Sequence, residues 1–428
     1  MSYYSDENIK TKYVEPRVYV ANSRAVFDLD LTESAYMPNL QLGFLGLTST
    51  QVSQYNGLVG AASLIRSARL LDGKQVLSQL NEAQFYKGFQ NQNKSNANAG
   101  VRTSNMDLSI NGRSVEGLQG LIGRVQTPGI VRDKPIGSAT DATNLATIDL
   151  RDYFPILNAI QLLPTTVFKN LRIEIEFNAN LNNQVINNTA TGILLVTQRP
   201  LLIVDCMINE ETLNKVMKSM PREMVWSEVE HDQFIIPECV SGPGAPTSDG
   251  LIQNVDITLN GYNNKIVDQM LIVKEIGNSS LEIDSGSNTV IGLGKWSSQA
   301  CFKQTVQFRV NGRNILPGAG IQGDNERQGY MVDTFGDSCG YPGSNAYEED
   351  TTALVAGGPG TSGQLDYIGV YLGKQINNLQ INYSRVNVLQ ASAGKRATNA
   401  LLIGHSYGAV RKQLNMMTGG YVVDYQQM

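Results

Sequence analysis

Apolar and polar residues alternate strictly in two segments of the chain. The segment 169–196 reads KNLRIEIEFNANLNNQVINNTATGILLV, and apolar and charged residues alternate along its first part. Near the C-terminus, residues 377–386 read NNLQINYSRV and repeat the alternation. A period of two is typical of a β-strand with one face in a hydrophobic core and one face in water. Both segments are therefore predicted to be half-buried strands.

Weak similarities between the two halves of the chain recur at nearly one spacing. The two alternating segments are 208 positions apart. The segments TGILLV at 191–196 and TNALLI at 398–403 are 207 positions apart, as are FDL at 27–29 and FII at 234–236. This shared spacing predicts two tandem copies of a β unit of about 200 residues.

The clearest helical pattern lies at Asn209–Met220, between the two predicted copies. Its apolar residues recur at the spacing i, i+3, i+4 and i+7, which places them on one face of a helix. Asn209 is expected to cap this helix, acidic residues occupy its first turn, and Pro221 follows its end. We interpret the segment as the connector between the copies.

Two similar segments predict β-hairpins, DGKQVL at 72–77 and NGRNIL at 311–316. An Asp-Gly pair between apolar runs favours a type I′ turn. Asn260-Gly261 is an alternative equivalent of the first hairpin, and the two alternatives stay open at the level of the sequence.

Other segments carry weaker patterns. Ser78–Tyr86 is predicted to be a short helix capped by Ser78, and Asp149–Leu157 to contain a helical turn. Residues 90–146 and 317–364 are rich in Gly, Asn and Pro and are predicted to be long exposed loops. The polar residues 1–16 lack periodicity, so we expect an arm that is loose in the monomer.

The composition is that of a folded globular protein with few charges. Of the 428 residues, 41% are hydrophobic and 17% are charged, and the formal net charge is −5. A nucleic-acid-binding face needs an excess of basic residues, so this balance argues against such a role. The polar N-terminus lacks an apolar signal segment, and no apolar run is long enough to span a membrane. We therefore expect a protein that is made in a reducing compartment and is not secreted.

Cysteine and histidine are too sparse for a structural zinc site. The chain has only two histidines, and no CxxC pair occurs among its four cysteines, which are Cys206, Cys239, Cys301 and Cys339. Zinc ligands usually come in closely spaced pairs. We predict no metal site and no cofactor, and we expect reduced thiols.

The pattern nearest to a catalytic motif is GHSYG at 404–408, which follows an apolar segment. A strand followed by GxSxG is the nucleophile elbow of α/β-hydrolases. In that fold the acid and the base follow the serine, but the 22 residues after Ser406 contain no histidine and one acid, Asp424. The chain also lacks alternating strands and helices. We interpret the motif as a strand end that runs into a turn.

Three other candidates have simpler structural interpretations. The Walker-like segment 292–297, GLGKWS, lacks both the hydroxyl residue after its lysine and a required glycine. Glu174 and Glu176 fall on the wet face of one strand, and acid–base chemistry would need a cleft that shifts their pKa values. His231 could form a pH-sensing contact, but a lone histidine is more often structural. We predict no catalytic residue, and we do not expect an enzyme.

Four segments, taken in order, are similar to one protein family: NGLVGAASLIRSARLLDGKQVL at 56–77, FYKGFQNQNKSN at 85–96, DLRDYFPILNAIQLLPTTVFKNLRIEIEFN at 149–178 and QRPLLIVDCMIN at 198–209. They resemble the first half of double jelly-roll major capsid proteins, most closely those of virophages and Polinton-like viruses. The wider lineage includes adenoviruses, large DNA viruses and tailless membrane-containing phages. Copy two is matched mainly through the internal repeat, and 428 residues is short for the eukaryotic members.

The resemblance implies an all-β fold of two tandem eight-stranded jelly rolls with short helices. It implies an N-terminal arm at 1–16, jelly roll 1 at 17–208 and a connector helix at 209–222. Jelly roll 2 would follow at 223–415 and a C-terminal tail at 416–428.

The resemblance also implies a structural role in a virion. Three copies would form a pseudo-hexameric capsomer, and capsomers would tile an icosahedral shell. The implied partners are other copies of the chain, minor capsid or penton proteins and any membrane beneath the shell, but no specific nucleic acid. The alternatives are a β-sandwich module that binds glycans or a receptor, and a minor or penton virion protein.

Overall fold

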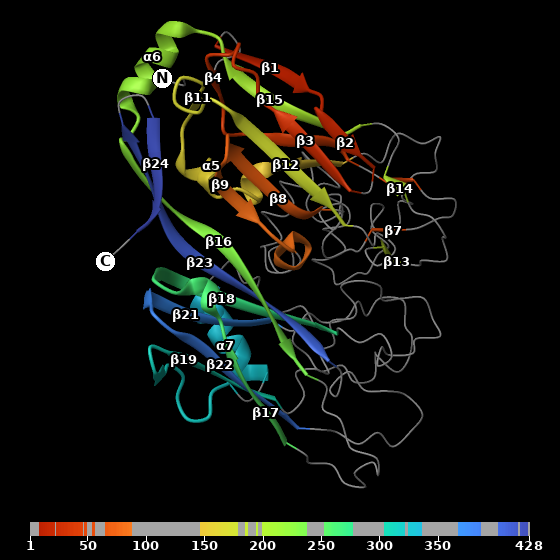
Figure 1. The fold of residues 1–428 in the computed structure, drawn as a ribbon, viewed down its shortest axis with the longest axis vertical. Helices are drawn as coiled ribbons and strands as arrows, with labels where there is room; N and C mark the ends of the chain where they lie inside the picture. Colours follow the sequence, from red (N-terminus) through yellow and green to blue (C-terminus); the bar gives the residue numbers. More distant parts are fainter. Residues whose placement is uncertain are drawn as a thin grey trace, which may run out of the picture.

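The chain forms two β-sandwiches, one above the other in Figure 1. The computed structural model describes residues 8–21, 23–45, 47–48, 54–55, 65–87, 146–178, 185–186, 194–195, 199–237, 252–276, 304–321, 324–335, 367–386, 401–417 and 420–426. Among the helices within these residues, none has the length and hydrophobicity that a membrane crossing requires.

The N-terminal sandwich contains two larger sheets and two short strand pairs. Sheet I has the order β10 (Ala146–Asp149), β5 (Gln41–Leu45), β15 (Leu201–Met207), β4 (Ala35–Tyr36) and β11 (Leu163–Pro164), and β1 (Ile9–Val14) also pairs with β15. Sheet II has the order β2 (Val18–Val20), β3 (Arg24–Asp28), β12 (Leu171–Phe177), β8 (Ile65–Asp72) and β9 (Gln75–Leu80). The short pairs are β13 (Val185–Ile186) with β7 (Gln54–Tyr55), and β14 (Leu194–Leu195) with β6 (Leu47–Thr48).

The C-terminal sandwich is built from two sheets. Sheet III has the order β16 (Glu223–Ile236), β23 (Leu402–Met417), β18 (Lys265–Ile276) and β21 (Tyr367–Ile376), and β24 (Gly420–Tyr425) also pairs with β23. Sheet IV has the order β17 (Ile252–Thr258), β22 (Leu379–Val386), β19 (Gln304–Val310) and β20 (Arg313–Asn314). The described helical segments of the chain are a helical turn at 83–87, η3 (Leu150–Asp152), α5 (Ile156–Ala159), α6 (Glu210–Ser219), η5 (Asn260–Tyr262) and α7 (Asp324–Phe335).

Eight strands of each sandwich have the same connectivity. In the N-terminal sandwich these are β1, β3, β5, β8, β9, β10, β12 and β15, and in the C-terminal sandwich they are β16 to β23. When each set is numbered from one to eight along the chain, both sandwiches have one sheet in the order 1-8-3-6 and one in the order 2-7-4-5. This is the two-sheet arrangement of a jelly roll. The predicted fold class, two tandem eight-stranded jelly rolls, is confirmed.

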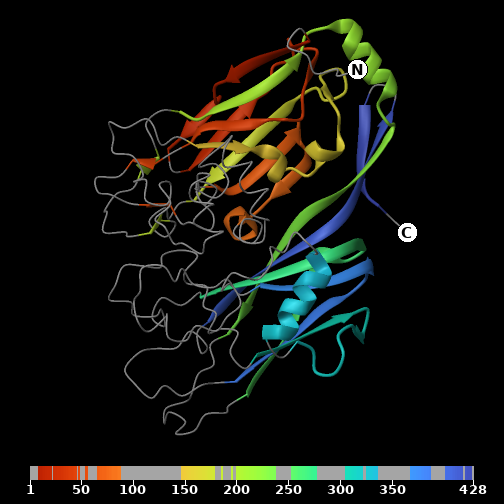
Figure 2. The same cartoon turned by 180° about the vertical axis from the view of Figure 1, so that it is seen from behind.

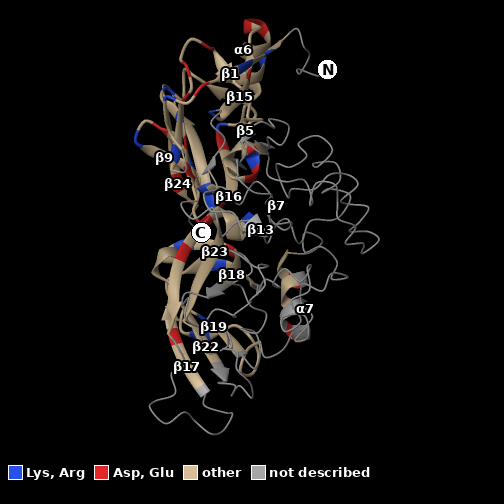
Figure 3. Ribbon diagram, turned by 90° about the vertical axis from the view of Figure 1, so that its right-hand side faces the viewer, with Lys and Arg blue, Asp and Glu red and all other residues tan. Residues whose placement is uncertain are grey.

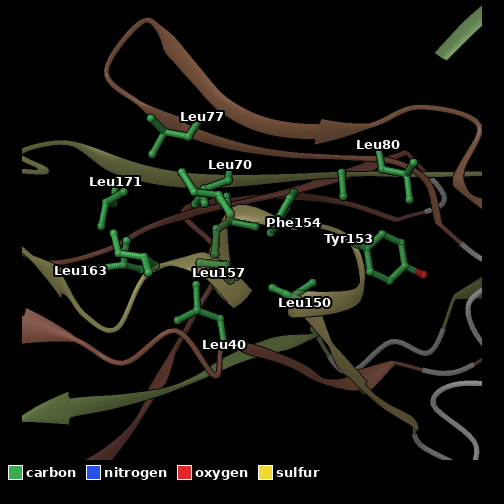
Figure 4. Close-up of a cluster of buried hydrophobic side chains, with 14 of the residues drawn as sticks. Leu40, Leu70, Leu77, Leu80, Leu150, Tyr153, Phe154, Leu157, Leu163 and Leu171 are labelled. Carbon is green, nitrogen blue, oxygen red and sulfur yellow. The ribbon is translucent and has the colours of Figure 1, made fainter. Parts of the chain in front are cut away.

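The alternating pattern of the sequence places one face of each strand in the core. In β12 the apolar residues at 171, 173, 175 and 177 are buried, while the charged residues between them remain partly or fully exposed. Figure 4 shows leucines of β8, β9 and β12 directed toward residues of η3, α5 and β11, which form the opposite side of the core. Each large apolar side chain buried in this way stabilises the fold by about 1.5–3 kcal/mol.

Helix α6 connects the two sandwiches, as the sequence predicts. The Asn209 side chain caps it by accepting a hydrogen bond of 3.0 Å from the Thr212 backbone N–H. Val216 is buried, and Leu213 and Met217 pack against the hydrophobic core of the N-terminal sandwich. The short helical segments η3 and α5 also lie within the predicted Asp149–Leu157 region or next to it.

Three predictions about the ends and loops are wrong. Residues 9–14 of the predicted loose arm form β1, whose backbone pairs with β15. Residues 420–425 of the predicted tail form β24, which pairs with β23. Residues 324–335 of the predicted loop form α7, which packs on β21 and is seen from behind in Figure 2. The partner of β1 lies nearly 200 residues away, whereas β24 pairs with the adjacent β23 and α7 packs on β21. The residues of these three elements do not show the regular apolar spacing that would have revealed them in the sequence.

The structure decides between the two hairpin alternatives. The segment at 72–77 joins β8 to β9, and the segment at 311–316 joins β19 to β20, so these hairpins are equivalent. Asn260-Gly261 lies in η5 instead. Asn311 and Gly312 both have positive φ, 52° and 81°, as a type I′ turn requires. At the first hairpin the turn residues are Gly73 and Lys74, and Gly73 alone has positive φ, so its predicted type I′ turn is wrong.

Two further expectations differ from the structure. Ser78 is a residue of β9 and not a helix cap; the helical turn begins at residue 83. The similarity between FDL at 27–29 and FII at 234–236 compares strands that are not equivalent, because β3 lies in sheet II and β16 in sheet III. The segments 191–196 and 398–403 lie largely outside the described residues, as do the loops at 90–146.

Candidate functional site

The most extensive buried polar site lies where the two sandwiches meet. Strands β16 and β23 pair along 14 residues, from Glu223 with Asn415 to Ile236 with Leu402. The first part of β16 packs against β9 and α5 of the N-terminal sandwich, and its last part contributes Phe234 and Ile236 to the C-terminal core. One pair of long strands therefore belongs to both sandwiches, as Figure 1 shows.

Sheet III is buried on both faces at this junction. Met270 and Ile272 of β18 point into the C-terminal core. Their neighbours Leu271 and Val273 point to the other side, into the core that is shared with the N-terminal sandwich. The two sandwiches are thus joined by continuous apolar packing, because successive residues of a strand face opposite sides of the sheet.

Glu228 of β16 is a fully buried carboxylate at the centre of this junction. Its Oε1 accepts hydrogen bonds from Ser78 Oγ at 2.7 Å and from the Gln79 backbone N–H at 3.2 Å. Its Oε2 accepts one from Trp226 Nε1 at 2.8 Å. Strand β9 is an edge strand of sheet II, so Glu228 satisfies an edge N–H that would otherwise be buried without a partner.

The environment of Glu228 changes its acidity. Burial raises the pKa of the Glu228 carboxyl above its usual value, although Lys412 and the three hydrogen bonds act in the opposite direction. Lys412 itself lies 3.3 Å from Glu230 Oε1. A carboxylate that is removed from water in this way is stabilising only while its hydrogen-bond partners stay in place.

A second buried polar contact joins His231 of β16 to His405 of β23. His231 Nε2 and His405 Nδ1 are 3.1 Å apart, a distance at which one ring donates and the other accepts. The Phe85 ring lies 4.4 Å from the His405 ring, and Tyr407 Oη donates to the Glu82 backbone carbonyl at 2.7 Å. The helical turn after β9 is therefore held against β23.

Acidification is expected to weaken this contact. Burial, together with the nearby His405, lowers the pKa of His231 from 6.5 to about 4, against the opposing effect of Glu82. The lowered pKa means that the folded state prefers neutral His231. The contribution of His231 to the free energy of unfolding is therefore complete above pH 6.5 and is lost as the pH falls toward 4. We expect a loss of about 2 kcal/mol between pH 6.5 and 4.5, measured by urea unfolding at each pH.

The variant His231→Gln isolates that contribution, because glutamine can keep a hydrogen bond to His405 but does not titrate. The difference in unfolding free energy between wild type and variant should shrink on acidification to pH 4.5 and change sign if the glutamine fits well. A difference that is constant from pH 7.5 to 4.5 would contradict the assigned role of His231. Measuring the difference removes the acid dependence that other carboxylates contribute to both proteins.

The aromatic residues of β24 add a third contact between the sandwiches. Tyr421 Oη donates to Asp72 Oδ2 at 2.8 Å, and the Tyr421 ring lies 4.7 Å from the Phe168 ring. Burial and the neighbouring Asp72 carboxylate raise the pKa of the Tyr421 hydroxyl, so it remains protonated and continues to donate. The C-terminal strand is thereby fastened to the N-terminal sandwich.

Ser406 is not placed as the nucleophile of an elbow. It is fully buried in the middle of β23, where its Oγ lies 3.0 Å from Tyr262 Oη and 3.1 Å from the Asp232 backbone carbonyl. The strand continues through it to residue 417, so the predicted turn after 403 is wrong. A Cβ on Gly404 would overlap the Phe234 ring, and one on Gly408 would overlap the Tyr262 ring. The two glycines of the motif therefore allow aromatic rings to lie on the strand.

The remaining candidates from the sequence lie apart from the junction. Glu176 on the outer face of sheet II accepts from Ser67 Oγ at 2.8 Å, and Glu174 lies 4.0 Å from an Arg172 nitrogen. Cys206 is a buried free thiol. The segment 292–297 and the other three cysteines lie outside the described residues. Within the residues that the structure describes, no three side chains of His, Cys, Asp or Glu could hold a metal ion together.

Sequence reasoning missed Glu228, although a signal for it exists. In the first half of β16 the buried positions are Met224, Trp226 and Glu228, which share one face of the strand. A carboxylate that continues an apolar face predicts a buried partner for it. That partner, the edge of β9, is 149 residues away and could be located only in three dimensions.

A polar hollow of about 680 Å³ lies on the outer face of sheet IV. Its walls are side chains of β17, β22 and β19, among them Asp256, Arg309 and Asn382, and residues 318–319. Asn382 Nδ2 donates to Asp256 Oδ1 at 2.7 Å. Amides, hydroxyls and single charges of this kind can bind a hydroxylated ligand.

Comparison with solved structures identifies the fold. The chain is similar to VP54 of PBCV-1, fitted into a cryo-EM reconstruction of the virophage Sputnik, with a TM-score of 0.56 and 10% identity over 98% of this chain and 97% of that chain. It is similar to the mavirus major capsid protein with a TM-score of 0.55 and 9% identity, over 99% of this chain and 91% of that one. It is also similar to a cryo-EM structure of the Sputnik virophage, with a TM-score of 0.51 and 10% identity over 98% of this chain and 88% of that chain.

These similarities show a double jelly roll along nearly the whole chain, as the resemblance in the sequence implied. No protein-family model matches the chain, and the search of curated protein sequences found no significant match. At 9–10% identity the structures establish the fold alone.

Proposed function

We propose that this protein is a major capsid protein whose trimer forms a pseudo-hexameric capsomer of an icosahedral virion. The observation that carries the proposal is the repeated strand order, which puts two equivalent jelly rolls in one chain. Three such chains around an axis present six similar sandwiches, and a six-sided block tiles a closed shell. The fold shared with virophage capsid proteins supports this role.

The buried junction supports the same proposal for a mechanical reason. A ring of six sandwiches closes only if the two sandwiches of each chain keep a constant relative orientation. Apolar packing on both faces of sheet III and the contacts of Glu228, His405 and Tyr421 hold that orientation. Relative motion would have to expose buried apolar surface and unpaired polar groups, which is costly.

The proposal assigns no catalytic role to any residue. Ser406 is enclosed in a strand by Tyr262, away from any substrate. Acidic and basic residues are interspersed along both sandwiches in Figure 3, which supports a role without a specific nucleic-acid partner. The proposed partners are further copies of the chain and minor capsid or penton proteins, at a membrane where one underlies the shell. The protein would be located in the virion, after assembly inside the host cell.

The oligomeric state tests the proposal. We expect purified protein at micromolar concentration to have three times the monomer mass of 46.7 kDa by size-exclusion chromatography with light scattering. Negative-stain microscopy should show six-sided blocks. A protein that stays monomeric across the accessible concentration range, with no assembled particles, would contradict the proposal.

The second candidate is a glycan- or receptor-binding virion protein. The polar hollow on sheet IV favours it, because amide and carboxylate groups there could hydrogen-bond a sugar. A glycan array with the purified protein tests this candidate. Specific binding that Asp256→Ala abolishes would favour it over a purely structural role.

A further inference from the structure

Both histidines of the chain meet at the junction of the two sandwiches. The chain has only two histidines among its 428 residues. They are 174 positions apart, on β16 and β23, yet His231 Nε2 and His405 Nδ1 are 3.1 Å apart. Their ring centres are 5.3 Å apart, and His405 is buried. Any proton that this pair binds beyond its neutral state places a positive charge inside the junction, where charge is costly.

The helical turn at 83–87, which follows β9, closes over this pair. The Phe85 ring lies 4.4 Å from the His405 ring, and the Tyr86 ring lies 5.3 Å from the Tyr407 ring. Tyr407 Oη donates to the Glu82 backbone carbonyl at 2.7 Å. The turn is therefore held on sheet III through His405 and its strand neighbour Tyr407.

The pair can bind one proton without losing its hydrogen bond. The protonated ring then donates to the unprotonated nitrogen of the other ring. A second proton places a hydrogen on both facing nitrogens, so two donors and two positive charges would lie 3.1 Å apart. This arrangement is repulsive and leaves both donors without an acceptor, so the rings have to separate.

The charged groups around the pair determine how acidic the solution must be. Burial and the nearby His405 lower the pKa of His231 to about 4, while Glu82 of the turn acts in the opposite direction. Glu82 is itself paired with Arg66 of β8 at 2.8 Å. Lys87 donates to a backbone carbonyl of η3 at 2.6 Å, so its ammonium group is held by the N-terminal sandwich.

The other elements that pack on the pair present uncharged groups. Strand β18 contributes Leu271 and Val273, and α7 contributes Met331. The Tyr407 ring lies 5.0 Å from the His231 ring. The acidic residues on either side of His231 in β16 point to the opposite face of the strand. Glu82 is thus the charged side chain that faces the pair among the described residues of these elements.

The second polar contact of the junction responds to acid in the opposite way. Glu228 and His231 are three positions apart, so they point to opposite faces of β16. Glu228 holds β9 through Ser78 and Gln79. Burial raises the pKa of Glu228, so acid protonates it readily, and the protonated carboxyl keeps an oxygen that accepts these two hydrogen bonds. Acid therefore preserves the contact with β9.

We propose that the His231–His405 pair is a proton-operated latch, in which uptake of a second proton releases the helical turn at 83–87 from sheet III while β9 stays bound through Glu228. The opening is local, because the two contacts lie on opposite faces of β16. In the proposed capsomer, release of the turn would loosen the fixed orientation of the two sandwiches in acid. That consequence rests on the proposed function, whereas the latch is a property of the single chain.

Protonation of the pair can be followed directly. Because the chain contains only two histidines, labelling histidine Cε1 with ¹³C gives nuclear magnetic resonance signals from these two rings alone. We expect two separate protonation steps, the lower one near pH 4, because the first charge opposes the second. Two rings that titrate together at about pH 6.5, as exposed histidines do, would overturn the proposal.

Hydrogen exchange measures release of the turn in the full chain. Wild type is compared with His231→Gln and His405→Gln at pH 7.5 and at pH 4.5, and circular dichroism checks that each protein is folded. Comparison at the same pH removes the intrinsic pH dependence of exchange. From pH 7.5 to 4.5, the exchange rate of residues 82–87 in wild type, relative to that in each variant, should rise at least about tenfold.

Two controls show whether the opening is local and specific. Residues 75–80 of β9 should keep the same relative exchange rate within about twofold, since Glu228 holds that strand in acid. Ser227→His adds a titrating histidine at an exposed position of the same strand and should behave as wild type. Faster exchange of 75–80 together with 82–87 would show that the whole junction opens, and would overturn the local latch.

The remaining outcomes separate the latch from the proposed function. An acid response of residues 82–87 that is equal in wild type and in both folded variants would overturn the latch and leave the proposed capsid role standing. If one variant does not fold, the other variant and the titration of wild type decide. A chain that is monomeric at every concentration would contradict the proposed capsomer but would still support the latch if the turn is released in acid as described.

Discussion

Replacing Glu228 with alanine is expected to lower the free energy of unfolding by about 3–5 kcal/mol. The carboxylate accepts hydrogen bonds from Ser78 Oγ, the Gln79 backbone N–H and Trp226 Nε1 inside the junction. Alanine leaves all three donors without an acceptor, and water cannot reach a side chain that is fully buried. Urea unfolding at pH 7 measures the loss.

Two further variants show whether the hydrogen bonds cause this loss. Glu223→Ala removes an exposed carboxylate from the same strand, so we expect a change within about 0.5 kcal/mol. Glu228→Gln keeps one acceptor oxygen, but its side-chain NH₂ group then faces a hydrogen-bond donor instead of accepting from it. We therefore expect an intermediate loss of about 1–2 kcal/mol in the free energy of unfolding. If Glu228→Ala costs no more than Glu223→Ala, the carboxylate does not hold the sandwiches together.

The sign of the pH dependence provides an independent check on Glu228. Because burial raises its pKa in the folded state, the folded protein favours the protonated carboxyl. The contribution of the Glu228 carboxyl to the free energy of unfolding is therefore complete below its unfolded pKa of about 4.5. That contribution is lost as the pH rises through the pKa of the folded state. Glu228→Gln removes this dependence, which is opposite in sign to that of His231.

Gly404→Ala is expected to cost about 3 kcal/mol of stability, although both residues are small. Gly404 lies directly opposite Phe234 in the ladder between β16 and β23, and the added Cβ would overlap the Phe234 ring. The ring belongs to the C-terminal core and is surrounded by packed side chains, so it cannot move aside cheaply. Thermal and urea unfolding of the variant measure the cost.

The control for Gly404 is Gly420→Ala, because a Cβ at residue 420 would meet no atom within 4 Å. We expect that variant to change stability by less than about 0.5 kcal/mol. The double variant Gly404→Ala, Phe234→Leu should be more stable than the sum of the single effects predicts, because the smaller side chain removes the overlap. Additive effects would show that the ring is not what requires glycine at 404.

The two variants test different properties of the same junction. Glu228 supplies acceptors for the edge of β9, and Gly404 allows β16 and β23 to pair closely where they enter the C-terminal core. Both effects depend on the long strand pair that the two sandwiches share.

Local patterns in the sequence were sufficient for elements whose stability depends on their own residues. The period of two at 171–177 and 379–386 predicted β12 and β22, because alternation directly records which face is buried. The predicted helix after Asn209 is α6, because its cap and apolar face are both local features. The repeated spacing of β12 and β22 also indicated two tandem copies.

The sequence-based predictions that the structure contradicts share a physical cause, which is that residues outside the segment decide its structure. Strand β1 was assigned to a loose arm because its residues have no regular apolar period, and it is ordered by pairing with β15, nearly 200 residues away. Ser78 resembled a helix cap, but pairing with β8 makes it part of a strand. The glycines around Ser406 resembled a catalytic turn because the sequence does not reveal the rings of Phe234 and Tyr262 that lie on them.

The sequence by itself therefore determined the all-β class, the duplication and the connector helix, since these follow from periodicity within short segments. Only the tertiary structure decided that β1 and β24 complete the sheets, that Glu228 meets the edge of β9 and that His231 meets His405. The physical reason is that a strand and a buried polar group are both stabilised by partners across the sheet or the junction. Except for β23, which directly precedes β24, those partners are distant in the sequence, and folding alone brings them together.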